Sequence, residues 1–185
     1  MKKYLFLFVA ALYIIACNPG GGSGTGNHDS LTDASSGKDS LSNVPLPFTA
    51  EYSSNFVAGK ASDVAAVLKN YKAWQDNDME ALGATFGDSV TIAFSSGYTF
   101  SGTHDSLMKM AKLYRDSLSN VSLTFDAWTS HHSVDKNEDW VNVWYKEVDT
   151  YKNGKKDSIN FEDANQVKDG KIVTVLSYSR KFKKK

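Results

Sequence analysis

The chain has 185 residues, of which 41% are hydrophobic and 12% aromatic, enough for the core of one domain. Its 21 basic and 21 acidic residues give a formal net charge of zero. That balance argues against the strongly basic surface on which nucleic-acid binding depends. We therefore expect no nucleic acid among its partners.

Residues 1–16 have the pattern of a bacterial export signal. Lys2 and Lys3 precede an uninterrupted apolar run at residues 4–15, which is too short to span a bilayer comfortably and has the length of a signal-peptide core. The run ends in the letters IIAC, which resemble the lipobox of bacterial lipoproteins. Lipid attachment would also explain Cys17, the single cysteine of the sequence, which cannot form an internal disulfide. The alternative is an ordinary secretory leader in which Cys17 is coincidental.

The lipobox resemblance implies cleavage before Cys17, acylation of that residue and anchoring in a membrane. Loss of Lys2 and Lys3 would leave 19 basic against 21 acidic residues, a net charge of about −2. No acidic run directly follows Cys17, so nothing marks the protein for surface display. We expect it at the periplasmic face of the outer membrane.

Residues 17–60 are predicted to be a flexible tether. Gly, Ser, Asn, Asp and Thr dominate residues 18–43, and such a composition buries too little apolar surface to offset its ordering entropy. About 40 residues of this kind reach on the order of 35 Å. Within the tether, residues 55–59 could begin a helix. The folded domain is predicted at 61–182, followed by a basic tail at 183–185.

Three helices are predicted in the first half of the domain. The first begins at Ser62-Asp63, the second spans Met79–Phe86 with Asp78 as its cap, and the third follows Thr103 and ends near residue 120. The apolar stripe of the first helix consists of Val64, Val67, Leu68, Tyr71 and Trp74.

In the remaining segments apolar and polar residues alternate, as is typical of strands. Strands are expected at 89–94 and 98–101, and three or four more follow from residue 121 to the end of the domain. Asn153-Gly154 and Asp169-Gly170 are typical of tight hairpin turns. Helices first and hairpin-linked strands later predict an α+β domain with a segregated, antiparallel sheet.

Several ordered motifs resemble the nuclear transport factor 2-like superfamily, in particular its SnoaL-like and ketosteroid-isomerase-like branches. They are YKAWQDND and MEAL at 71–82, FGD at 86–88, Gly102, and DGKI at 169–172 with Tyr178 downstream. The resemblance covers about residues 61–182. It implies a conical α+β barrel, in which a curved mixed or antiparallel sheet wraps an N-terminal helix beside an apolar pocket, with two further helices. It also implies a homodimer.

The isomerase branch uses a carboxylate base, a tyrosine and a protonated aspartate. Carried over by motif, the base position falls at Phe94, which cannot accept a proton. The tyrosine position falls near Asn70. Tyr71 is the next residue, but its side chain leaves the helix in a different direction. The aspartate position falls at Asp163, where the acid is retained.

Strand periodicity supports a special position for Asp163 independently of that resemblance. Asp163 and Asn165 share a strand face with Ile159, Phe161 and Val167, so both should point toward the core. A buried carboxyl must be paired or neutral, and burial raises its pKa. Asp163 and Asn165 either form a ligand-facing pair in a pocket or make structural bonds to the first helix or a backbone turn.

Histidines give little support for a metal site. His131 and His132 are adjacent, so they point to opposite faces of a strand, and no spacing typical of zinc ligands occurs. We expect neither a metal nor a cofactor.

We expect a lipid-anchored periplasmic domain that binds a small, mostly apolar ligand or a partner without catalysis. One alternative is an isomerase, dehydratase or cyclase that uses Asp163 as acid or oxyanion donor, together with Tyr71, Tyr98 or a histidine. Another is a dimerisation module without ligand. The predicted ligand-binding residues are Tyr71, Trp74, Phe94, Asp163, Asn165 and Tyr178.

Overall fold

The computed structural model describes residues 45–181. From Leu46 onward the described residues belong to one compact unit, and within the described range the chain has seven strands and three helices. The signal peptide, Cys17, most of the tether and the basic tail lie outside the described residues, so those expectations stay predictions. The strands are β1 (Phe56–Ala58), β2 (Phe86–Phe94), β3 (Thr99–Thr103), β4 (Leu118–Ser133), β5 (Glu138–Tyr151), β6 (Lys156–Lys168) and β7 (Lys171–Lys181). The helices are α1 (Ala61–Asp76), α2 (Met79–Gly83) and α3 (His104–Arg115).

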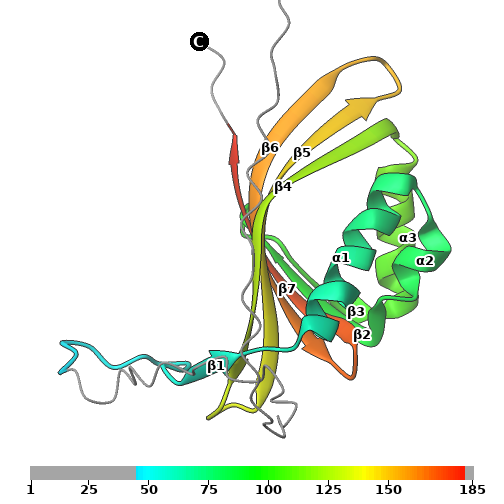
Figure 1. The fold of residues 1–185 in the computed structure, drawn as a ribbon. Coiled ribbons are helices and arrows are strands. Elements are labelled where there is room, and N and C mark those ends of the chain that lie inside the picture. The colour runs from blue at the N-terminus through cyan, green and yellow to red at the C-terminus, as the bar shows by residue number, and fades with distance from the viewer. Residues whose placement is uncertain (1–44, 182–185) are drawn as a thin grey trace, which may run out of the picture. The chain divides into compact units, whose positions relative to one another are not determined.

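One curved sheet carries all three helices on its concave side (Figure 1). The strand order is β1-β4-β5-β6-β7-β2-β3. Every neighbouring pair is antiparallel except β2 and β7, which run parallel. The sheet is therefore mixed and ends at β1 and β3 without closing. The α+β class and the sheet around the first helix are confirmed, whereas the purely antiparallel pairing expected from strand order alone is wrong.

Helix α1 begins one residue earlier than predicted. Lys60 occupies its N-cap without a side-chain bond, and Asp63 lies in the first turn, where a carboxylate complements the helix dipole. The predicted break is confirmed: Asn77 adopts a left-handed conformation. Asp78 then accepts a 2.9 Å hydrogen bond from the Ala81 amide and starts α2.

Residues 55–59 do not begin a helix; they contain strand β1, which pairs with the end of β4. The Gly59 amide donates to the Ser130 carbonyl at 3.0 Å. A Cβ atom at Gly59 would lie 2.0 Å from Ser130 Oγ, so a side chain has no room at this crossing. The glycine marks a close approach of two backbones rather than a weak helix.

Two predicted helix ends are too late. Helix α2 ends at Gly83, because the segment from Phe86 joins the sheet, with Phe86 opposite Ile172 of β7. Helix α3 starts with Thr103 as its cap, as predicted, but ends at Arg115. Leu118 already pairs with Tyr151 of β5. In both places strand pairing with a distant segment overrides the local helical pattern.

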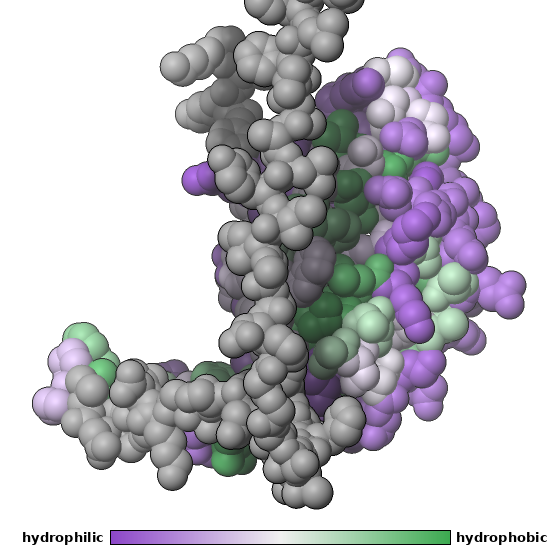
Figure 2. All heavy atoms as spheres, viewed as in Figure 1, coloured by the Kyte–Doolittle hydropathy of each residue, from purple (hydrophilic) through white to green (hydrophobic). Residues whose placement is uncertain are grey.

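The core lies between α1 and the inner face of the sheet. Figure 2 shows hydrophobic side chains gathering there, while the outer surface of the helices is largely hydrophilic. No helix within residues 45–181 is long and apolar enough to cross a membrane. The buried hydrophobic cluster consists of Val67, Tyr71, Val141, Val143, Tyr145, Val167, Ile172 and Val175.

Candidate functional site

A cavity of about 600 Å³ adjoins this core, a volume typical of small-molecule sites. Its wall is mostly apolar and is supplied by all three helices and by β2, β5, β6 and β7. Phe94 and Tyr98 flank the β2–β3 turn, are partly exposed and stack with their ring centroids 5.8 Å apart. Because both also line the cavity, this turn forms part of its rim.

Asp163 forms the first polar cluster of the cavity. The Tyr71 hydroxyl from α1 and the Tyr145 hydroxyl from β5 both donate to Asp163 Oδ2, at 2.8 and 2.9 Å. Asn165 Nδ2 donates to the Val141 carbonyl at 3.2 Å and, more weakly, to the Tyr71 hydroxyl at 3.5 Å. All four side chains of this cluster are at least nine-tenths buried.

Burial raises the pKa of Asp163, and the hydroxyl groups of Ser177, Tyr71 and Tyr145 act in the opposite direction. The same burial, reinforced by the Asp163 charge, holds the pKa values of both tyrosines well above their usual range. The phenols therefore remain protonated donors. Asp163 Oδ1 is buried and accepts no hydrogen bond of normal geometry among the described residues, although the Ser177 hydroxyl lies close to this carboxyl.

Glu147 and Asp149 of β5 form the second polar cluster. Trp74 Nε1 donates to Glu147 Oε1 at 3.3 Å, and the Tyr114 hydroxyl donates to Asp149 Oδ2 at 2.7 Å. The Trp74 and Tyr114 rings stack nearly parallel, 6.1 Å apart. Since residues two apart on a strand share a face, β5 presents both carboxyl groups to the cavity side by side.

Burial raises the pKa of Glu147 to about 8, and the neighbouring Asp149 charge adds to this shift. A glutamate with such a pKa holds its proton at neutral pH and can release it to a suitable partner. Burial, followed by the hydrogen bond to Asp149, also raises the pKa of Tyr114. The cluster thus combines a protonated carboxyl and an adjacent acid in a largely apolar wall.

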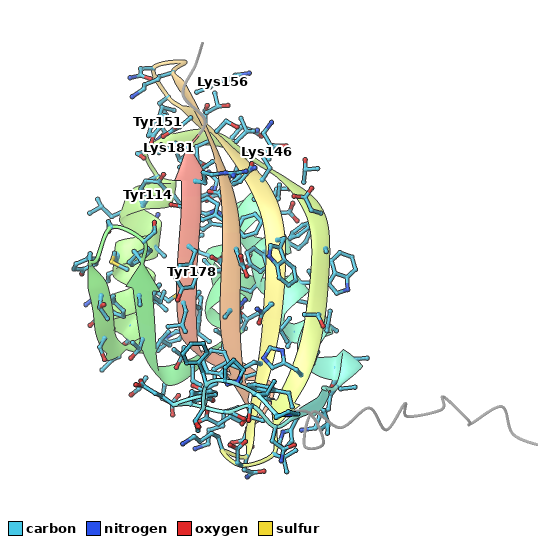
Figure 3. All side chains as sticks on the ribbon, turned by 90° about the vertical axis from the view of Figure 1, so that its left-hand side faces the viewer. Tyr114, Lys146, Tyr151, Lys156, Tyr178 and Lys181 are labelled. Carbon is cyan, nitrogen blue, oxygen red and sulfur yellow. The ribbon has the colours of Figure 1, made fainter. Side chains whose placement is uncertain are left out.

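The structure places five of the six predicted ligand-binding residues at this cavity. Tyr178 is the exception, since it is 61% exposed and does not line the cavity. Its neighbours Ser177 and Ser179 do line it, so strand alternation turns Tyr178 outward. Figure 3 shows Tyr178 on β7 at the face of the sheet opposite the helices. Ligand binding by the other five, Tyr71, Trp74, Phe94, Asp163 and Asn165, stays a prediction.

The tyrosine position reached by motif, near Asn70, does not carry the phenol that contacts Asp163. Asn70, the position reached by motif, donates to Thr85 Oγ1 at 2.7 Å. Tyr71 makes the bond to Asp163 instead. The motif position therefore lies one residue away from the side chain that points into the core. Phe94 does line the cavity, and a phenyl ring there cannot act as a base.

Sequence reasoning missed Glu147, Asp149, Tyr145 and Tyr114. The first three share a face of β5 with the buried Val141 and Val143. The alternation was readable in the sequence: two acids continue an apolar face in which polar groups are unexpected. Tyr114 lies on α3, and the local pattern of a helix does not indicate which strand its hydroxyl will reach.

The histidines of the described part of the chain do not assemble a metal site. His131 packs edge-on against Phe56, while His132 Nδ1 lies 2.8 Å from Asp139 Oδ1. Within residues 45–181 no group of three or more His, Cys, Asp and Glu side chains could hold a metal ion.

The architecture is that of the nuclear transport factor 2-like fold, to which ketosteroid-isomerase-like and SnoaL-like proteins also belong. No family model and no curated protein matches the sequence. Similar solved structures include a Mycobacterium tuberculosis epoxide hydrolase of the LEH-like type (TM-score 0.56, 13% identity, 64% of this chain and 83% of that chain).

Two further structures are similar. One is a nuclear transport factor 2-like protein of unknown function from Burkholderia pseudomallei (TM-score 0.53, 17% identity, 65% and 92% coverage). The other, from Kribbella flavida, is provisionally assigned as a ketosteroid isomerase (TM-score 0.53, 12% identity, 69% and 84% coverage). At such identities the likeness establishes the fold and leaves the chemistry to the site.

Proposed function

We propose that this protein is a lipid-anchored domain of the bacterial cell envelope that binds a small, mostly apolar ligand. The observation that carries the proposal is the cavity of about 600 Å³. Its apolar wall is interrupted by two clusters of polar groups, a buried one around Asp163 and a partly buried one around Glu147. A wall of this kind encloses the apolar part of a ligand, while the few polar groups fix the orientation of that ligand.

Binding without catalysis is favoured over isomerase chemistry because the base position holds Phe94. Asp163 is also engaged, since both hydrogen bonds from Tyr71 and Tyr145 end on its Oδ2 atom. A carboxylate held in this way is oriented and stabilised by its neighbours. It is better suited to recognising a polar group of a ligand than to shuttling a proton.

Lipid attachment at Cys17 would hold the domain at the membrane, and we place it at the periplasmic face of the outer membrane. The Cys17→Ser variant is expected to move from the membrane to the soluble fraction of cells. Continued membrane association of that variant would refute the anchor. A homodimer is also part of the proposal, and sedimentation velocity of the released protein tests it.

The ligand itself can be sought by native mass spectrometry of the whole protein purified from its host. We expect a co-purifying small molecule that is lost from the Asp163→Asn variant and retained by Glu162→Gln. Glu162 is exposed and neighbours Asp163 in the sequence on the other face of β6, so it is a matched control. An empty cavity, together with no binding in a metabolite screen, would refute the proposal and favour the dimerisation module.

One observation supports an enzyme as the second candidate. Glu147, with its pKa raised to about 8, lies beside Asp149 in the same cavity, and a carboxyl group with a raised pKa next to a second acid is a common acid–base arrangement. In that case Glu147 rather than Asp163 would transfer the proton. Turnover of an epoxide or enone substrate that Glu147→Gln abolishes, while Glu162→Gln leaves it unchanged, would establish this candidate.

A further inference from the structure

We infer that the ligand is an organic cation: an apolar molecule carrying a protonated amine, with the ammonium group bound at the carboxyl groups that line the cavity. The inference rests on the proposed function and names the ligand class of the same cavity. The main evidence for this inference is the charge balance of the cavity wall.

Three carboxyl groups line the cavity, those of Glu147, Asp149 and Asp163, and no lysine, arginine or histidine among the described residues lines it with them. None of the three takes part in an ion pair found between residues 45 and 181. Buried carboxyl groups are either paired with a positive charge or kept protonated, because desolvation of the charged form is costly. The missing countercharge is the first evidence for a cationic ligand.

Arg115 is the basic side chain close to this region, and it is committed elsewhere. Its guanidinium donates to the Trp74 and Gln75 carbonyls at the end of α1, at 3.1 and 3.3 Å. It also lies 5.9 Å from the centre of the Trp74 ring. Arg115 therefore caps the C-terminal end of α1 next to Trp74 and does not line the cavity.

Unsatisfied acceptors are the second, separate evidence. Asp163 Oδ1 and Asp149 Oδ1 are both buried and accept no hydrogen bond of normal geometry among the described residues. Their polar neighbours are the Ser177 hydroxyl beside the Asp163 carboxyl and the Glu147 carboxyl beside Asp149. Both aspartates are only 5% exposed, and they belong to different hydrogen-bonded clusters. Leaving a buried acceptor unpaired is unfavourable by itself. A ligand with several N–H donors would satisfy such groups, which a neutral hydrocarbon or an anion cannot do.

The remaining wall distinguishes an organic cation from a metal ion. The three carboxyl groups do not converge with other ligands on a common point, since no metal-binding group exists in residues 45–181. The space between them is bounded by aromatic rings, including Tyr145 and Phe161, whose centroids are 5.2 Å apart in a stacked pair. Aromatic faces attract diffuse cations, and the cavity volume leaves room for the apolar part of the ligand.

Binding of the cation should depend on pH, because it is linked to the protonation of Glu147. Because burial raises the pKa of Glu147 to about 8, a cation that needs its carboxylate must displace a proton at lower pH. Affinity for the cation should therefore fall about tenfold per pH unit below pH 8 and level off above it. The titratable and charged groups around Glu147 are Asp149 and Tyr145 on β5, Asp163 on β6, Tyr71 on α1, and Tyr114 and Arg115 on α3.

Three probes of the same shape and different charge test the inference on the whole protein: 4-phenylbutylamine, 4-phenylbutanol and 4-phenylbutyrate. Calorimetry at pH 8.5 should give an affinity for the amine at least about tenfold above that for the alcohol, with the butyrate weakest. Glu147→Gln and Asp163→Asn should each remove most of the preference for the amine and leave alcohol binding nearly unchanged. Glu162→Gln, whose exposed carboxylate lies on the other face of β6, should keep the preference.

The outcomes separate this inference from the proposed function. If the alcohol or the butyrate binds as tightly as the amine, or if amine affinity is the same at pH 6 and 8.5, the cation inference is overturned while ligand binding stands. If none of the three probes binds, the cation inference is overturned, and the metabolite screen decides the proposed function separately. If Glu147→Gln and Glu162→Gln lose the preference for the amine over the alcohol to the same extent, that preference comes from the general surface charge. This result would also overturn the inference.

Discussion

Substitution of Glu147 by glutamine should change how the stability of the protein depends on pH. In the folded state burial and the Asp149 charge raise the Glu147 pKa from 4.5 to about 8. Between these values the folded chain binds a proton that the unfolded chain has released, so the free energy of unfolding falls as pH rises. The pKa difference corresponds to a loss of up to about 5 kcal/mol, complete above pH 8.

Urea unfolding followed by tryptophan fluorescence at pH 5.0 and 8.5 measures the effect. Over that interval the wild-type chain should lose about 4 kcal/mol relative to Glu147→Gln. The glutamine cannot ionise, and its carbonyl can still accept the Trp74 Nε1 hydrogen bond. Taking the difference between the two proteins cancels the other titrating groups. At pH 8.5 the variant should therefore be the more stable of the two.

Glu162→Gln provides the control, since that exposed side chain is on the outer face of β6. Its stability difference from the wild type should be nearly the same at both pH values. Parallel pH profiles for wild type and Glu147→Gln would refute the reasoning. They would mean that water or a local rearrangement solvates the Glu147 carboxylate.

Three further substitutions test the local arguments. Tyr145→Phe removes one of the two donors to Asp163 and should cost about 1–3 kcal/mol in urea unfolding; a change below 0.5 kcal/mol would contradict the buried bond. Asp78→Ala removes the α2 cap and should cost about 1 kcal/mol, whereas Asp78→Asn, which retains the acceptor, should cost much less. Gly59→Ala should detach β1 from β4, seen as faster amide exchange at residues 56–58; unchanged protection there would show that the Cβ is accommodated.

The site was only partly predictable from the sequence. The alternation of β6 was sufficient to turn Asp163 and Asn165 toward the core, because side-chain direction in a strand follows from local geometry. The same reasoning applied to β5 would have identified Glu147 and Asp149. It could not have identified Trp74 and Tyr114 as their donors, since nothing local links two helices to that strand.

The sequence by itself determined the α+β class, the inner stripe of α1, the caps of α2 and α3, and the hairpin turns at Gly154 and Gly170. These features depend on side-chain periodicity, local capping bonds and turn conformations, all of which act over a few residues.

The tertiary structure alone decided which distant groups meet. The hydrogen bond from Tyr71 to Asp163 joins residues 92 positions apart, and the parallel pairing of β2 with β7 converts the end of a predicted helix into a strand. Such contacts are set by how the curved sheet packs on α1. A local pattern says which face of an element is buried but does not say what it faces. Glu147, Asp149 and Asp163 became one cavity wall for that reason.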